Sequence, residues 1–298
     1  MLSQHTASRG ISCVRHAVGL VRRHPALLWF PILGLGGIGI TFVAGLRFVY
    51  ELLGLVWWAR GTGLVRLVEV AAIGGWYICA AGTLTAMNAA LIHETTEALD
   101  GNSPSVRAGF EAVWANRRAL SLVAVVTGLF WLLDQLLRRH GSLPGRIASV
   151  LANIAWGAVS FFLIPVALDT RSSGVSIFSE SVETFRSVWG EALTASFGLG
   201  FVALIGLAPT GPLYLLATSV LGGFAGQFTT VLLALYLAGL SVLGVTTIGV
   251  TRAALYRYAT TGELAWFDST TIAEMAITET NATSEASASP GQYDRTGQ

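Results

Sequence analysis

The stretch that decides the fold is residues 228–250, which read FTTVLLALYLAGLSVLGVTTIGV and contain no Asp, Glu, Lys or Arg. An α-helix rises about 1.5 Å per residue, so about 20 consecutive apolar residues cross the hydrocarbon layer of a membrane. Inside hydrocarbon every backbone N–H and C=O must find a partner within the protein, and an α-helix supplies these partners within one segment. Residues 228–250 are therefore predicted to form a transmembrane helix.

Similar apolar runs fill most of the chain. It has 298 residues, of which 53% are hydrophobic and 12% charged, and its mean hydropathy is +0.63. A chain of this length and composition cannot bury its apolar surface in one soluble core. A transmembrane β-barrel would alternate polar and apolar residues over segments of about ten, and the sequence shows no such alternation. The prediction is an all-α membrane protein with six transmembrane helices, at residues 26–46, 67–91, 119–137, 147–168, 192–217 and 228–250.

The arginines indicate the two sides of the membrane. The chain contains no lysine, so all 18 of its Lys and Arg residues are arginines. Arg9, Arg15, Arg22 and Arg23 precede the first predicted span with no acid among them. The positive-inside rule places such arginine-rich segments in the cytoplasm. We therefore expect a multi-pass protein of the cell membrane with both termini in the cytoplasm.

Amphipathic segments precede the third and the fifth predicted spans, and a weaker one precedes the first. Their apolar residues recur at the spacing of one helix face, with charged residues on the opposite face. Helices of this kind lie in the plane of the membrane surface. The sequence thus predicts three repeats of an interfacial helix followed by a helical hairpin. The three apolar stripes are Ile11, Val14, Val18 and Val21; Val106, Phe110, Val113 and Trp114; and Phe178, Val182, Phe185 and Trp189.

The second and third stripes share a Phe-x-x-Val-Trp core, at residues 110–114 and 185–189. The alternative interpretation is that loops between spans are often amphipathic and that the shared residues are coincidental. Both interpretations predict that each segment is a helix on the membrane surface.

The composition of the chain changes after Gly262. Residues 263–298 are rich in Ser, Thr, Ala and Glu and contain few large apolar side chains. Such a segment cannot bury enough apolar surface to offset the entropy lost on ordering. We expect a membrane domain at residues 1–262 and a disordered polar tail at residues 263–298.

Two short patterns resemble binding motifs. Gly34, Gly36 and Gly39 match the G-x-G-x-x-G pattern of dinucleotide folds, but they lie inside a predicted span, where small residues let helices approach closely. His93 and Glu97 have the i, i+4 spacing of zinc ligands on a helix. A zinc protease would carry a second histidine in place of Glu97, and no third ligand is identifiable. The sequence therefore predicts helix packing at the glycines, a solvated helix end at His93 and Glu97, and neither a metal nor a cofactor.

Three acids, Glu51, Glu69 and Asp134, lie toward the outer ends of predicted spans. An acid at the centre of the bilayer costs about 2.5–3.5 kcal/mol on insertion scales and usually marks an ion or proton pathway. These three have arginines nearby, so we expect ion pairs whose side chains reach toward water. The central turns of the six predicted spans carry no Asp, Glu, Arg or His. The sequence thus predicts neither catalytic residues nor an ion-coupled transport site.

Three stretches carry a family resemblance: FLIPVALD at 162–169, ESVETFRSVWG at 180–190 and ALYRYATTG at 254–262. They resemble a family of uncharacterised six-span prokaryotic membrane proteins. More loosely, the chain is similar to the membrane domains attached to some glycerophosphodiester phosphodiesterases, without their catalytic domain. The resemblance implies a fold and a membrane location, but no activity and no functional residues.

Three function classes remain open. The first is a non-enzymatic accessory protein that acts on lipids, on the cell envelope or on a membrane partner through its surface helices. The second is a transporter or channel for a neutral or apolar solute, gated where Pro209 and Pro212 interrupt the fifth span. The third is a membrane-embedded enzyme that uses His93 and Glu97. The expected partners are the lipid bilayer and other membrane proteins, and no nucleic acid.

Overall fold

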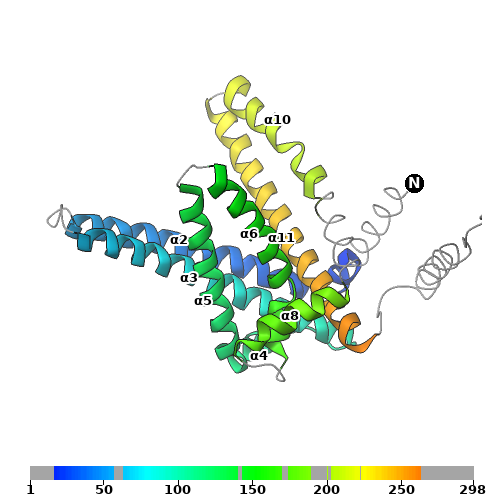
Figure 1. The fold of residues 1–298 in the computed structure, drawn as a ribbon. Helices are drawn as coiled ribbons and strands as arrows, with labels where there is room; N and C mark the ends of the chain where they lie inside the picture. The colour runs from blue at the N-terminus through cyan, green and yellow to red at the C-terminus, as the bar shows by residue number, and fades with distance from the viewer. Residues whose placement is uncertain are drawn as a thin grey trace, which may run out of the picture. The chain divides into compact units, whose positions relative to one another are not determined.

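The structure is a computed structural model, which describes residues 17–56, 63–139, 143–169, 174–188, 200, 203–221 and 223–262. Helices make up nearly all of these ranges, and no strand occurs in them (Figure 1). The predicted all-α fold is therefore confirmed. The tail at 263–298, predicted to be disordered, lies outside the described residues, as do Ile11 and Val14 of the first stripe.

Long helices form from the apolar runs and end at glycines. Gly101 follows α3 with a φ of +87°, and Gly262 follows α11 with a φ of +72°, a left-handed backbone that favours glycine. The described elements are η1 (Pro25–Leu28), α2 (Trp29–Val56), α3 (Gly63–Leu99), α4 (Val106–Ala115), α5 (Arg117–Arg139), α6 (Leu143–Ser160), α7 (Leu163–Leu168), α8 (Ser176–Ser187), α10 (Thr210–Leu215), the π-helix η3 (Leu216–Leu221) and α11 (Gly223–Thr261).

Four described helices are long and apolar enough to cross a membrane. They are Pro25–Phe48, Ala71–Leu99, Arg117–Arg138 and Gly223–Thr261. They correspond to the first, second, third and sixth predicted spans. The chain is thus an all-helical protein with four candidate membrane helices among its described residues, and the fourth and fifth predicted spans are not among these four.

The predicted fourth span, residues 147–168, is not one continuous helix. The structure divides it into α6 and α7, with a turn at Phe161 and Phe162 between them. Leu163 and Val166 of α7 are buried against other helices of the protein. A high hydropathy shows that a segment avoids water, and a protein interior removes it from water as well as lipid does. For this reason the sequence could not show that protein, in place of lipid, covers Leu163 and Val166.

The predicted fifth span, residues 192–217, is described only in part. An apolar helix covers Ala203–Ser219 and is shorter than the candidate spans. Its turn at Ala208 and Pro209 coincides with the predicted interruption. The chain then continues through α10 into η3, a π-helix that connects to α11.

The glycine motif of α2 packs in part against α3. A Cβ atom at Gly37 would lie 2.7 Å from Cγ2 of Thr83, and Gly34 also faces α3. A Cβ at Gly36 or at Gly39 would meet open space. The predicted packing role therefore holds for the face that carries Gly34 and Gly37, whereas the other two glycines face away from α3.

Two further hairpins pair neighbouring helices. In the α5–α6 hairpin, Phe130 stacks on Trp156 with ring centroids 4.7 Å apart. Next to α11, the hydroxyl of Tyr236 donates a hydrogen bond of 2.6 Å to the backbone carbonyl of Gly206. These contacts join segments that are adjacent in sequence, as a series of hairpins requires.

The buried core lies at one end of the long helices. It takes residues from the end of α3, the start of α5, all of α7, α8 and the end of α11, and we call this region the core end. Many large apolar side chains elsewhere on α2 and α11 are exposed, for example Ile40 and Leu235. The core residues are Ala89, Ile92, Leu120, Val123, Phe162, Leu163, Ile164, Val166, Ala167, Ile177, Val188, Ala253 and Leu255.

The two described surface helices, α4 and α8, differ in what covers their apolar residues. Phe178 and Phe185 of α8 pack against the core, so protein covers this part of the stripe that was predicted to face lipid. On α4, Val113 packs against the core, but Phe110 is 37% exposed and Trp114 is 71% exposed. Among the described aromatic residues of these two helices, Phe110 and Trp114 of α4 are the exposed ones, and Trp189 lies outside the described residues. The described contacts of α4 and α8 are therefore not equivalent.

Candidate functional site at the core end

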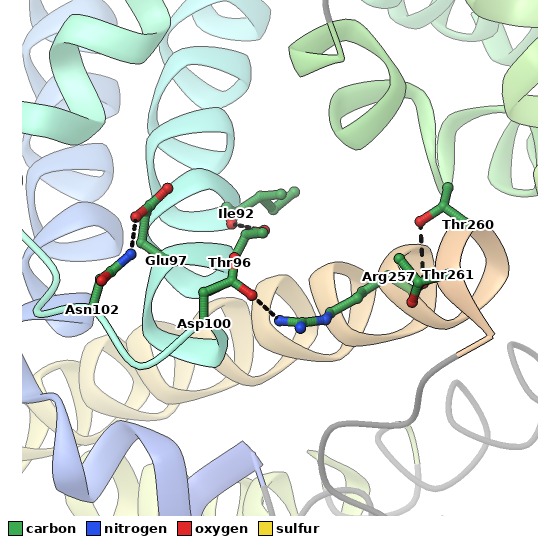
Figure 2. A network of polar contacts seen from close by, with 8 residues as sticks. All are labelled: Ile92, Thr96, Glu97, Asp100, Asn102, Arg257, Thr260 and Thr261. Atoms are coloured by element: carbon green, nitrogen blue, oxygen red, sulfur yellow. Dashed lines mark hydrogen bonds and ion pairs between the residues drawn. The ribbon is translucent and has the colours of Figure 1, made fainter.

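The last turns of α3 hold the predicted pair His93 and Glu97. Glu97 accepts a hydrogen bond of 2.8 Å from the side-chain amide of Asn102, in the turn that follows α3 (Figure 2). Within the described ranges, no three His, Cys, Asp or Glu side chains come together to hold a metal ion. The geometry gives Glu97 a role in closing this turn.

Glu94 is the residue that sequence reasoning missed. It lies in the same stretch as His93 and Glu97, yet it is only 1% exposed. Its Oε2 accepts a hydrogen bond from the backbone N–H of Ser105, the residue that caps α4. Its Oε1 has no hydrogen-bond partner among the described residues. The carboxylate of Glu94, which belongs to α3, thus lies at the N-terminus of α4, where free N–H groups and the helix dipole favour negative charge.

Close packing explains why Glu94 is buried. A Cβ atom at Gly109 of α4 would lie 2.9 Å from the ring of Phe30 and 3.1 Å from Cγ of Glu94. Only a glycine therefore lets α4 approach this near, and its approach seals the carboxylate from water. In the sequence, the small residue Gly109 beside Phe110 was the one indication of this close packing. It could be interpreted only once α3 was known to be the helix that packs against α4.

Polar contacts tie the end of α11 to the surrounding helices. Arg257 of α11 donates a hydrogen bond to Asp100 and forms an ion pair with it (Figure 2). The hydroxyl of Tyr256 donates to Oδ2 of Asp169, which follows α7, over 3.3 Å. These contacts lie beyond the apolar core and connect the ends of α3, α7 and α11.

Arg252 lies in α11 one turn before Tyr256. Its guanidinium carbon is 5.1 Å from the ring centroid of Phe161, in the turn between α6 and α7. Its Nε atom is buried and has no hydrogen-bond partner among the described residues. Arg252 and Glu94 are thus the two described residues with a buried, unpartnered side-chain nitrogen or oxygen, and no ion pair joins them within the described part of the chain.

The acids predicted near the opposite ends of the spans behave largely as expected. Asp134 accepts a hydrogen bond of 2.9 Å from Nε of Arg138, so its predicted ion pair is confirmed. It also accepts hydrogen bonds from Ser149 and Asn153 of α6, which were not predicted. These contacts make Asp134 a link between α5 and α6.

The other two acids are exposed or undescribed. Glu51 lies 3.8 Å from Arg47 on α2, and both side chains are exposed, which confirms the predicted ion pair. Glu69 belongs to α3, but its side chain lies outside the described residues. Glu51 does not belong to the core end.

A small cavity of about 90 Å³ lies between α2, α3 and α11. Its lining is mostly apolar and includes Leu84, Met87 and Val242, with Asn88 and Ser241 as polar members. The Asn88 amide donates to the backbone carbonyl of Leu84 over 3.0 Å. The cavity is separate from Glu94 and Arg252 and offers few polar groups to a ligand.

Comparison with protein families connects most of this architecture to one group. Residues 67–266 match the model of a family of unknown function, DUF6159. The chain belongs to this family. The DUF6159 region runs from α3 to the end of α11 and includes the three stretches that carried the family resemblance. No curated protein and no solved structure is similar to the chain.

Glu94, Arg252 and the Asp100–Arg257 pair all lie within the DUF6159 region. Chemically, this arrangement offers a buried carboxylate that is partly hydrogen-bonded and a cation without an acceptor. The family itself assigns them no activity.

Proposed function

We propose that the protein is a six-span protein of the cell membrane, with cytoplasmic termini, that acts without catalysis on lipids or on a membrane partner. The core end then lies at the cytoplasmic face, and α4 lies in the membrane surface. The looser likeness to the membrane domains of glycerophosphodiester phosphodiesterases belongs to this proposal at the level of fold alone.

The directions of the helices support six crossings. α5 leads from Leu120 in the core to Asp134, far from it, and α6–α7 returns from Ser149, beside Asp134, to Val166 in the core. If α5 crosses the membrane, α6–α7 must cross back. α11 also ends in the core, so an inward crossing by α11 requires an outward crossing before it, and we assign that crossing to the apolar Ala203–Ser219 segment.

The exposed aromatic residues of α4 are the observation that carries the lipid role. Trp114 and Phe110 project from the helix beside Arg107, and the guanidinium of Arg117 lies 5.1 Å from the Trp114 ring. Aromatic and arginine side chains together suit the boundary between headgroups and acyl chains. Glu111 pairs with Arg107 at 2.8 Å, and both side chains are exposed.

Spin labels can test whether α4 touches lipid. A single cysteine at position 110 or 111, in a chain with Cys13 and Cys79 changed to Ser, would carry the label in liposomes. We expect oxygen, which concentrates in lipid, to relax the label at 110 more than a water-soluble nickel chelate does, and the reverse at the control position 111. Preference for the chelate at both positions would remove α4 from the lipid surface.

A cellular assay connects this contact to function. Phe110→Ser together with Trp114→Ser should remove the phenotype that complementation of a deletion strain restores, at normal protein levels. Glu111→Ala, on the same helix, should complement fully. Full complementation by the double variant would contradict a role for the α4 surface.

A second candidate is a channel or transporter for a small neutral solute. The 90 Å³ cavity between α2, α3 and α11 and the π-helix after Pro212 favour it, because π-helical turns often occur at functional sites. Proteoliposomes should then take up glycerol faster than empty liposomes, and Asn88→Leu should slow the uptake. Glycerol entry at the rate of empty liposomes would contradict the channel for solutes of this size.

A further inference from the structure

The guanidinium N–H groups of Arg252 have no hydrogen-bond acceptor among the described residues. A guanidinium carries five N–H donors and no acceptor, so it normally binds carboxylates, phosphates or carbonyl oxygens. The neighbouring Arg257 has Asp100, and Arg107 has Glu111. Arg252 makes its one described contact with the ring of Phe161, and its buried Nε has no partner within the described residues.

Two carboxylates of the core end have other hydrogen-bond donors. Oε2 of Glu94 accepts from Ser105, and Oδ2 of Asp169 accepts from Tyr256. No ion pair between Arg252 and an acid occurs in the described part of the chain. A buried charge without a partner is costly, and an aromatic ring offsets only part of that cost. An external anion would complete the site.

The shape of the Arg252 side chain and its place in the fold indicate which anion it would bind. The planar fork of a guanidinium matches two oxygens of a phosphate group. Arg252 is five residues before Arg257, whose ion pair with Asp100 is partly exposed, so the site lies close below the surface at the core end. Basic pockets between membrane helices at the cytoplasmic side suit anionic lipid headgroups.

We propose that Arg252, positioned by its contact with the ring of Phe161, binds a phosphate group at the core end. The phosphate belongs either to the headgroup of an anionic phospholipid or to a soluble phosphate. The inference rests on the proposed function only for the position of the core end at the membrane surface. It does not involve the exposed face of α4.

The experiment measures binding to the purified full-length protein in detergent. Native mass spectrometry and thermal unfolding would be recorded with dioleoylphosphatidylglycerol, with dioleoylglycerol, which has the same chains without the phosphate, and with inorganic phosphate. The variants are Arg252→Gln, Arg252→Lys and the control Arg118→Gln, an exposed arginine at the start of α5.

We expect one phosphatidylglycerol per wild-type protein, bound roughly tenfold or more tightly than by Arg252→Gln, since a charge-assisted bidentate contact is lost. Arg252→Lys should show an intermediate affinity, because it keeps the charge but not the fork. Arg118→Gln should match the wild type, and dioleoylglycerol should bind all four proteins alike. Inorganic phosphate that stabilises the wild type but not Arg252→Gln, without an effect of the lipid, identifies a soluble phosphate and supports the site.

Equal binding of phosphatidylglycerol and of phosphate by the wild type and Arg252→Gln would overturn the proposal. If Arg252→Gln does not fold, the wild type and Arg252→Lys decide the matter: equal affinities for both probes, or no greater stabilisation by phosphatidylglycerol than by dioleoylglycerol, would overturn it as well. The Phe110→Ser/Trp114→Ser variant separates the two proposals. It should lose the surface contact of α4 and keep the binding that depends on Arg252.

Discussion

Asp100, just beyond α3, forms an ion pair with Arg257 of α11, although the two residues are 157 positions apart in the sequence. Two to three turns earlier, Leu91 of α3 packs against Gly249 of α11. Both contacts run in the same order along the two helices, so α3 and α11 run in the same sense where they cross. Their ends therefore meet at the core end.

The Asp100–Arg257 pair should contribute modestly to stability. Its side chains are 45% and 23% exposed, so solvent screens the attraction. A double-mutant cycle with Asp100→Asn and Arg257→Gln should give a coupling of about 0.5–1 kcal/mol in the free energy of unfolding in detergent. The pair Arg107–Glu111, which is more exposed, serves as the control and should couple more weakly. Equal coupling in both cycles would show that the first pair does not hold the helices together.

Gly249→Ala should destabilise the protein. The added Cβ would lie 2.5 Å from Cδ2 and 3.1 Å from Cγ of Leu91, so this buried side chain would have to shift. Overpacking of this kind costs about 1–3 kcal/mol. Gly244→Ala, in the same helix, adds a Cβ in open space and should leave the free energy of unfolding unchanged or slightly higher, since alanine favours helix. Similar effects of the two substitutions would contradict the tight crossing of α3 and α11.

Glu94→Ala should loosen α4, because the backbone N–H of Ser105 would lose its acceptor. The expected loss is about 1–3 kcal/mol in the free energy of unfolding. Glu94→Gln keeps a carbonyl oxygen for this contact and should lose less. Glu97→Gln and His93→Asn should change stability little and should retain the cellular phenotype, as expected if neither residue is catalytic. Loss of the phenotype from either of these two at normal protein levels would instead favour an active site there.

Asp134→Asn should weaken the α5–α6 hairpin. The carboxylate accepts from Ser149, Asn153 and Arg138, whereas an amide offers one acceptor and brings donors of its own. We expect a loss of about 1–3 kcal/mol, measured as the free energy of unfolding in detergent. Glu51→Gln, which changes an exposed pair, should be nearly neutral. A neutral Asp134→Asn would mean that the three donors find other acceptors.

Cysteine labelling tests the topology. In a chain with Cys13 and Cys79 changed to Ser, a cysteine at position 142 should react with an impermeant reagent added to intact cells. Cysteines at positions 102 and 173 should react only after permeabilisation, as the positive-inside rule and a crossing by α6–α7 require. Reaction at 173 but not at 102 in intact cells would show four crossings in place of six. Reaction at 102 would reverse the orientation.

Hydropathy in the sequence was sufficient to predict the helical class and four candidate spans, because it reports which segments avoid water. Hydropathy could not show whether lipid or protein covers an apolar segment. Leu163 and Val166 of α7 read as membrane residues but lie inside the core. Phe185 of α8 read as a lipid anchor, yet it packs 5.8 Å from the ring of Phe161, measured between centroids.

Glu94 shows the corresponding limit for polar residues. Three ionisable residues, His93, Glu94 and Glu97, crowd one helix end, and the sequence alone predicts that water surrounds them all. Which of them is buried depends on where α4 docks, and that depends on the small size of Gly109. The ion pair of Asp134 could be predicted from the sequence because its partner Arg138 is four residues away on the same helix. Its partners in α6 follow from tertiary packing.

The contact of α3 with α11 also bears on how the protein is made. The ribosome delivers α3 to the membrane long before α11, so during synthesis the face of α3 that carries Leu91 waits without its final neighbour. Chains of this kind assemble N-terminal parts first and expose unfinished apolar surfaces in the meantime. A chain that stalls before Gly223 would present this face, with Asp100 unpaired by Arg257, to membrane chaperones and proteases. Completion of α11 is therefore the step at which this face of α3 gains its final neighbour.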